Sequence, residues 1–251
     1  MKKNFLFLFL LTLSQLVLAQ TYHLGVSGGV NSTYFLNRDI TYGASDTDYV
    51  ITAGYQFSAF SSVFFDNGGY YSKRLYGIKA GIEYAFHNQT FDVFNPSLGP
   101  GIPREFYRYK LKLTFIDFPL LFNCASSHHQ GFYGEIGPVL SFQQSQSYQM
   151  IENKTTENIT PDLSKYEFEA ITLNLVLGLG IMVNQTEKLA FFGSLRFGHS
   201  LFPNALQISG PRSTVSHYRA WGGIIFGGVY KINKYDAKKR KRIKKFKGEV
   251  A

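Results

Sequence analysis

Residues 171–183 read Ile-Thr-Leu-Asn-Leu-Val-Leu-Gly-Leu-Gly-Ile-Met-Val, and this stretch decides the fold class. Every second position from Ile171 to Val183 is a large aliphatic residue, whereas the intervening positions include Thr172, Asn174 and two glycines. A period of two residues is typical of a β-strand with one apolar face. Globular strands usually have about five or six residues, and a membrane-spanning strand needs about 9–11. The length of this run therefore favours a strand that crosses a membrane.

Seven further runs share this strand-like character and bring the total to eight. The runs cover residues 22–31, 49–65, 70–87, 107–123, 131–145, 167–183, 188–202 and 217–231. Three short turns, near residues 66–69, 126–130 and 184–187, alternate with polar connections of roughly 15–20 residues. This arrangement predicts an all-β fold, an eight-stranded antiparallel up-and-down transmembrane β-barrel. We expect it in the Gram-negative cell outer membrane, with both termini and the short turns in the periplasm.

Composition supports a membrane barrel. Phe, Tyr and Trp make up 17% of the residues, and the mean hydropathy is −0.10. Outer-membrane barrels carry aromatic girdles at both interfaces, and their alternating strands average to a hydropathy near zero. No stretch after the N-terminal region approaches the run of about 20 apolar residues that a transmembrane helix needs. The composition therefore favours spanning by strands.

The two ends of the chain differ from the part between them. A positively charged start, a short apolar stretch and a small-residue cleavage site predict a signal peptide over residues 1–19. The barrel is expected over residues 20–233, and a basic tail over residues 234–251. The cations that define the tail are Lys238, Lys239, Arg240, Lys241, Arg242, Lys244 and Lys245.

The net charge of +9 belongs to these ends. The signal peptide carries +2 and residues 231–251 carry +8, which leaves −1 for the barrel region. Two interpretations of the tail stay open: a solvated segment, or a periplasmic contact with acidic head groups, cell-wall polymer or an acidic protein. Nucleic acid is not expected as a partner, because a secreted chain does not meet it.

Several charged residues fall on the faces that the alternation turns toward the barrel interior. We expect this polar network to comprise Lys79, Glu83, Lys112, Glu135 and Arg196. The interior of an eight-stranded barrel is just wide enough to be filled by side chains, and buried charges there must pair. The favoured interpretation is a structural plug of salt bridges, and the alternative is a gated ion path.

No catalytic, metal-binding or cofactor-binding residue is expected. The only hint of nucleophilic chemistry is His199-Ser200, because some eight-stranded barrels are lipid A deacylases whose motif separates His from Ser by one residue on a single strand. Adjacent residues of a regular strand point to opposite faces. Ser200 would then lie out of reach of His199, and an unactivated serine is a poor nucleophile.

The segment 113–122, Leu-Thr-Phe-Ile-Asp-Phe-Pro-Leu-Leu-Phe, resembles the middle-strand signature of PorT-like outer-membrane β-barrels. In that signature an apolar or aromatic stretch and an acidic residue precede Pro-Leu-Leu. Residues 132–138, 177–180 and 195–198 resemble later strands of the same family. The resemblance implies a barrel without catalytic residues, whose founding type acts in type IX protein secretion.

Asp117 and Pro119 are the family-motif residues of this segment. We expect Pro119 at a strand end or bulge near the periplasmic rim, since proline cannot donate to a ladder. Leu111, Leu113 and Phe115 predict a lipid-facing row that Asp117 interrupts. Because a carboxylate against lipid is costly, we expect a bulge that turns Asp117 inward or into the interface.

The predicted function is that of a non-enzymatic structural or accessory subunit of the outer membrane, with a role in type IX protein secretion as the specific hypothesis. The alternative is a small porin-like or adhesion barrel that acts through its extracellular loops. Expected partners are outer-membrane lipid and a secretion-machinery or periplasmic protein.

Overall fold

The structure is a computed structural model that describes residues 21–37, 47–65, 74–94, 106–126, 130–153, 166–186, 188–203, 205–209 and 213–233. The predicted signal peptide and the predicted basic tail, including Lys238 to Lys245, lie outside the described residues. The described residues contain no helix long and apolar enough to cross a membrane.

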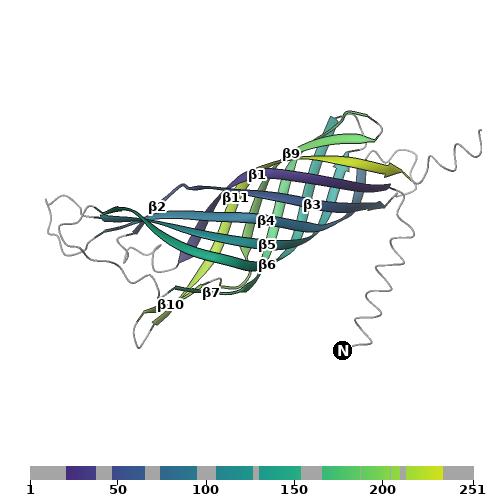
Figure 1. Cartoon of the computed structure of the whole chain (residues 1–251). Helices are drawn as coiled ribbons and strands as arrows, with labels where there is room; N and C mark the ends of the chain where they lie inside the picture. Colours follow the sequence, from purple (N-terminus) through teal and green to yellow (C-terminus); the bar gives the residue numbers. More distant parts are fainter. Residues whose placement is uncertain are drawn as a thin grey trace, which may run out of the picture.

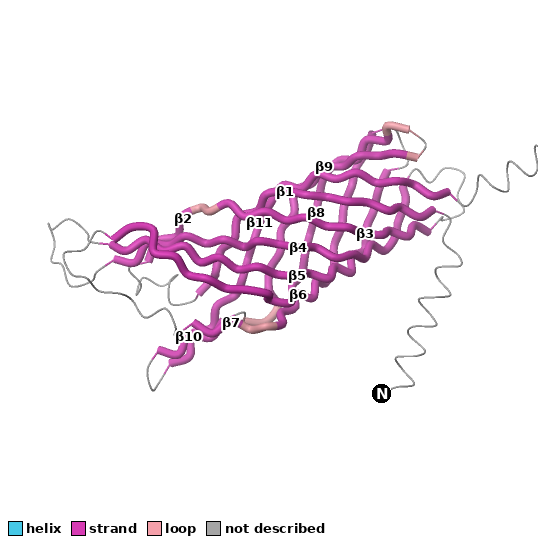
Figure 2. Tube along the Cα trace, viewed as in Figure 1, coloured by secondary structure: helices cyan, strands magenta, loops and turns pink. Residues whose placement is uncertain are grey.

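Eleven strands make up almost all of the described chain (Figure 2). Their bounds are β1 (Thr21–Asn37), β2 (Thr47–Val50), β3 (Ala53–Phe65), β4 (Arg74–Phe94), β5 (Phe106–Ser126), β6 (Gln130–Asn153), β7 (Tyr166–Phe168), β8 (Ile171–Asn184), β9 (Leu189–Ser200), β10 (Ala205–Ser209) and β11 (Ser213–Asn233).

Eight of these strands close a ring (Figure 1). Antiparallel pairing runs β1-β3-β4-β5-β6-β8-β9-β11, and β11 returns to β1 from Thr21↔Asn233 to Asn37↔His217. The prediction of an eight-stranded antiparallel barrel is confirmed. The three remaining strands were not predicted as separate elements: β2 pairs with β4, β10 with β11, and β7 with β10. The predicted runs 49–65 and 167–183 include the ends of β2 and β7, and β10 lies in a predicted connection.

One end of the barrel carries the short turns and the other the long connections; we call them the turn end and the loop end. The turn between β8 and β9 lies where predicted, and there the Leu189 N–H donates to Thr186 Oγ1 at 2.9 Å. The first residue of β1 and the last of β11 pair with each other, so both ends of the ring-forming chain lie at the turn end. The described barrel therefore begins and ends on the same side, whereas the termini themselves, in residues 1–20 and 234–251, lie outside the described residues.

The alternation of β8 separates two faces as predicted. Leu175 and Leu177 are 44% and 41% exposed on the outside, whereas Val176 between them is 1% exposed. Aromatic pairs border this outer apolar band at both ends. Tyr76 stacks on Phe122 near the turn end, and the rings of Tyr55 and Phe86 lie 4.6 Å apart toward the loop end.

The prediction for the fourth run was wrong about its faces. Leu111, Leu113 and Phe115 are buried on the inner side of β5, and Asp117 follows them on that same side. The apolar outward residues begin at Ile116 and continue through exposed Phe118, Leu120 and Phe122. Asp117 therefore faces inward by regular alternation, without the bulge that the sequence suggested.

The β5–β6 ladder contains two β-bulges, one on either side of Ser145–Met150. The register shifts between Thr114 and Phe115 and again between Arg108 and Tyr109, and each shift inserts one extra residue in β6. Such bulges increase the local twist of a strand.

Pro119 lies in the middle of β5, so its predicted position at a strand end or bulge was wrong. It is an inward, buried residue that faces Val139 of β6. The β4–β5 ladder skips the pairs opposite Phe118 and Pro119, since proline has no N–H to donate, and resumes in unchanged register from Leu120. β5 therefore continues as one strand on both sides of Pro119.

Glycines allow neighbouring strands to approach where the wall curves. A Cβ added at Gly180 would lie 2.0 Å from the Gly193 carbonyl oxygen, and one added at Gly29 would lie 2.1 Å from the Ile224 carbonyl oxygen. Both contacts are with backbone atoms of an adjacent strand. A side chain at either position would force the wall apart.

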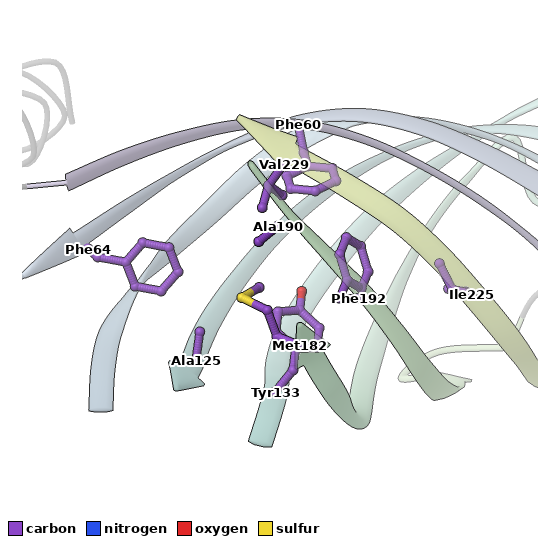
Figure 3. Close-up of a cluster of buried hydrophobic side chains, with 9 residues drawn as sticks. All are labelled: Phe60, Phe64, Ala125, Tyr133, Met182, Ala190, Phe192, Ile225 and Val229. Carbon is purple, nitrogen blue, oxygen red and sulfur yellow. The ribbon is translucent and has the colours of Figure 1, made fainter. Parts of the chain in front are cut away.

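An apolar cluster fills the interior toward the turn end. Figure 3 shows its members projecting from several strands toward one another: Phe60, Phe64, Ala125, Tyr133, Met182, Ala190, Phe192, Ile225 and Val229. Most of these side chains are almost completely buried. The cluster forms one wall of the polar network described below.

The wall of the barrel is uneven in height. Strands β4, β5 and β6 have 21, 21 and 24 residues, whereas β8 and β9 have 14 and 12. Since about 9–11 residues cross the bilayer, β4 to β6 continue far beyond the apolar band. We call the extension of β5 and β6, residues 106–113 and 144–153, the ribbon; in Figure 1 it projects to the left.

Candidate functional site: the ionic network of the barrel interior

Four of the five charged residues predicted for the interior come together there. Lys79 and Glu83 project from β4, Glu135 from β6 and Arg196 from β9, all at inward positions of the alternation. Each of the four is at most 4% exposed. Glu135 fits because residue 178 on the neighbouring strand is glycine: a Cβ there would lie 2.7 Å from Glu135 Cγ.

Glu135 is the centre of this network. Lys79 Nζ donates to its Oε2 at 2.9 Å, and Arg196 Nε donates to its Oε1 at 2.7 Å. The Tyr133 hydroxyl donates to the same Oε2 at 2.6 Å. Arg196 also reaches across the interior, where its Nη1 donates to Glu83 Oε2 at 2.6 Å. Charge-assisted bonds of this kind are the strong ones, and they satisfy both carboxylates.

The apolar cluster borders the network at Lys79. Its ammonium nitrogen lies 4.1 Å from the centroid of the Phe60 ring and 5.5 Å from that of Phe192. A cation held against aromatic faces in a desolvated place gains about 2 kcal/mol. The ionic and apolar parts of the interior therefore form one continuous filling.

A second ionic group lies toward the loop end. Asp117 sits between Glu83 and Ser141 in the ladders of β5 and interacts electrostatically with Arg219 of β11. Arg219 is fully buried, its Nη2 donates to Ser141 Oγ at 3.2 Å, and its guanidinium lies 3.9 Å from the centroid of the Phe115 ring. The motif aspartate thus contributes to the interior ionic network.

The two groups balance in charge. The three cations Lys79, Arg196 and Arg219 face the three anions Glu83, Glu135 and Asp117. A path selective for one sign of ion would be lined by a surplus of the opposite charge. The observed arrangement is instead what a static plug needs, because each buried charge has an opposite charge nearby.

Lys112 does not belong to this network, so its predicted inward position was wrong. Its side chain is exposed on the outer face of the ribbon, where Nζ donates to Gln149 Oε1 at 2.8 Å. The error follows from the reversed assignment of faces on β5, since Lys112 alternates with Leu111 and Leu113.

Replacing Lys112 with alanine is accordingly expected to change the free energy of unfolding by less than about 0.5 kcal/mol, because the residue makes one solvent-exposed hydrogen bond. Urea unfolding of the purified chain in lipid vesicles, monitored by circular dichroism, measures this. A loss comparable to that of an interior charge variant would contradict the assignment.

His199 and Ser200 point to opposite faces of β9, as predicted. His199 is exposed outside and stacks on Tyr218 with a centroid distance of 6.1 Å. Ser200 is buried inside, where its Oγ accepts a hydrogen bond from the Arg219 N–H at 2.9 Å. Within the described ranges, no group of three His, Cys, Asp or Glu residues could hold a metal ion.

Sequence reasoning missed Arg219 and Tyr133 as members of the interior network. Arg219 lies on β11, where large apolar residues such as Trp221 and Ile224 occur on both faces, so the sequence does not show which face is inward. Tyr133 lies two residues before Glu135 on the same inner face of β6, and this spacing lets its hydroxyl bond to the Glu135 carboxylate. That spacing is the signal that could have identified it.

The closed ring, the outer apolar band with aromatic borders and the filled interior define a small β-barrel of the outer-membrane class. A sequence model described as "Outer membrane protein beta-barrel domain" matches residues 18–205. The chain belongs to this family, and its place is the outer membrane of a Gram-negative cell. Among the curated proteins, none matches the chain.

Three solved structures illustrate what this chain is similar to, and the first is described as an outer membrane protein. OprG from Pseudomonas aeruginosa is 11% identical, with coverage of 86% of this chain and 97% of OprG and a TM-score of 0.43. Ail, the attachment invasion locus protein of Yersinia pestis, is 10% identical, with coverage of 84% and 98% and a TM-score of 0.33. Neisserial surface protein A is 9% identical, with coverage of 84% and 97% and a TM-score of 0.36.

Proposed function

We propose that this protein is a non-enzymatic interaction subunit of the outer membrane: a plugged barrel that anchors a projecting β-ribbon. The observation that carries the proposal is the contrast between the two parts of the molecule. The interior holds balanced ion pairs and an apolar cluster, whereas β4 to β6 continue well beyond the length that a bilayer requires. Chain length that is not needed for spanning is available for binding.

The specific assignment is an accessory role in protein export of the type IX kind, with the turn end in the periplasm and the loop end outside. It rests on the resemblance of residues 113–122 to PorT-like barrels. Asp117 of that segment helps to neutralise Arg219, so the motif also has a structural reason to be present. No residue is proposed as catalytic.

The second candidate is an adhesion barrel that binds an external surface through the same projection. The favouring observation is that the ribbon's outer face is polar and exposed, at Lys112, Ser147 and Gln149 for example. A porin-like role is less well supported because the charged residues fill the interior and neutralise one another.

One experiment separates these candidates. The tagged full chain is purified from its own outer membrane in mild detergent, and the proteins that accompany it are identified and quantified. We expect stoichiometric secretion-machinery components and, in planar bilayers, no steady conductance. Recovery of the barrel alone would contradict the accessory role and favour adhesion, and a steady conductance abolished by blocking the loop end would favour a porin.

A further inference from the structure

One edge of the far part of β6 has no partner strand among the described residues. Strand β8 pairs with β6 only from Gln130↔Val183 to Phe142↔Ile171, and a single further bond joins the Gln143 N–H to the Ala170 carbonyl at 2.9 Å. On its other side β6 stays paired with β5 as far as Asn153. In the part of the chain that the structure describes, no strand pairs with the β8-facing edge of residues 144–153.

The neighbouring strands turn away from this edge. Beyond β8 the chain forms β7, which pairs with β10, and β10 in turn pairs with β11. In Figure 1 the β7–β10 pair diverges from the projecting end of β6. An edge strand directs the N–H and C=O groups of alternate residues away from its partner, which makes it a template for another strand.

The sequence of this edge lacks the lysine and proline residues that commonly protect an edge against strand addition. Residues 144–153 read Gln-Ser-Gln-Ser-Tyr-Gln-Met-Ile-Glu-Asn, without Lys, Arg or Pro. The one charged residue, Glu152, is bonded to Arg108 at 3.4 Å. Bulges delimit the edge, and between them Ser145 to Met150 pair with β5 in unbroken register. This regular window of six residues is long enough for a strand to add.

The two faces of the ribbon specify what an added strand must carry. On the inner face, Tyr148 packs against the cluster of Leu111, Leu113 and Phe115, so apolar side chains suit that side. On the outer face, Ser147 pairs with Lys112 and Gln149 with Lys110. The charged residues of the ribbon are Arg108, Lys110, Lys112 and Glu152, which gives a net charge of +2. Acidic side chains therefore suit the outer side.

We propose that the β6 edge at residues 145–150 is a strand-acceptor site for an extended polypeptide segment that alternates apolar and acidic residues. The added strand pairs its backbone with β6, places its apolar residues beside Tyr148 and its acidic residues near Lys110 and Lys112. This inference rests on the proposed interaction function and names the kind of partner that it serves. Backbone pairing supplies affinity in this mode, and alternate side chains supply specificity.

The test uses the full chain in detergent micelles and three synthetic peptides of about ten residues. All three share a Val/Thr face, and their other face carries Glu, Ser or Lys. Fluorescence anisotropy is expected to show binding in the order Glu, Ser, Lys, with the acidic peptide at least about tenfold tighter than the basic one. The acidic peptide with every amide methylated should lose binding, because neither of its edges can then donate hydrogen bonds to β6.

A charge-reversal variant provides the matched control. Lys110→Glu combined with Lys112→Glu alters exposed side chains and leaves the edge backbone intact, so the order of the peptides should invert while the circular dichroism spectrum stays unchanged. A proline scan from Ser145 to Gln149 should abolish binding with a period of two. Where the replaced residue directs its N–H away from β5, proline leaves the hydrogen bonds to β5, and therefore the fold, intact.

Three results would overturn the strand-acceptor site: no binding by any of the three peptides, equal binding by the methylated peptide, or an unchanged order in the charge-reversal variant. Co-purification from the outer membrane is assayed in parallel with the wild-type chain. If partners co-purify but the peptide results fail, the edge proposal falls and the proposed function stands. If the peptides bind as expected but nothing co-purifies, the accessory role falls instead.

Discussion

Replacing Glu135 with alanine is expected to lower the free energy of unfolding by about 3–5 kcal/mol. The variant removes the carboxylate that bonds Lys79 and Arg196 at once, and it leaves the Lys79 ammonium buried without its ion-pair partner. Equilibrium urea unfolding in lipid vesicles, monitored by tryptophan fluorescence and circular dichroism, measures the change. Trp221 is the only tryptophan and lies inside the barrel, so its emission reports on the interior.

The double variant Lys79→Met with Glu135→Leu is the matched control. It removes one cation together with one anion, and it leaves Arg196 bonded to Glu83. If uncompensated charge is the cause of the loss, this variant should recover most of the stability that Glu135→Ala loses. A double variant as unstable as the single one would show that Glu135 matters through packing rather than through charge.

Replacing Gly180 with alanine is expected to prevent ring closure or to cost at least about 3 kcal/mol. The new Cβ would lie 2.0 Å from the Gly193 carbonyl oxygen and 2.6 Å from Ser194 Cα. Neither is a flexible side chain, so β8 and β9 would have to separate. The yield of folded protein on refolding into vesicles, together with urea unfolding of the folded fraction, gives the effect.

Gly228→Ala is the appropriate comparison because it adds the same methyl group on the outer face. Its nearest neighbours are Phe191 ring atoms at 3.5 Å, which is ordinary van der Waals contact. We expect a change within about 0.5 kcal/mol. Similar losses in both variants would mean that a property common to the two positions, and not the close approach of the backbones at position 180, causes the loss.

The eight-strand ring could be predicted because β8 carries one continuous apolar face from end to end and β9 repeats this alternation over most of its length. The assignment of faces failed on β5, and the physical reason lies in the two environments of that strand. Where β5 crosses the bilayer, its outward residues, from Ile116 to Phe122, are apolar. Beyond the bilayer the inner residues Leu111 to Phe115 are apolar and the outer ones polar. Applying one assignment of inner and outer faces to the whole strand therefore gives the wrong faces on one side of this reversal.

The interior network was partly predictable for a related reason. Lys79, Glu83, Glu135 and Arg196 stand out because they interrupt inner faces that otherwise carry small or polar residues. Their pairing could not be derived, since it depends on distances across the barrel: Arg196 and Glu83 are 113 residues apart in the chain. Arg219 could not be assigned to the interior from the sequence because both faces of the last strand carry large apolar residues.

The pairing of β1 with β11 sets the order in which this molecule can be made. The first strand to leave the ribosome finds one of its two partners only when the last strand has been synthesised and delivered, because the ladder extends from Thr21↔Asn233 to Asn37↔His217. A chain that ends before residue 213 would present two unsatisfied edges, on β1 and on β9. The ring can therefore close only in a full-length chain. A truncated chain would expose open strand edges, which favour aggregation and proteolysis in the envelope.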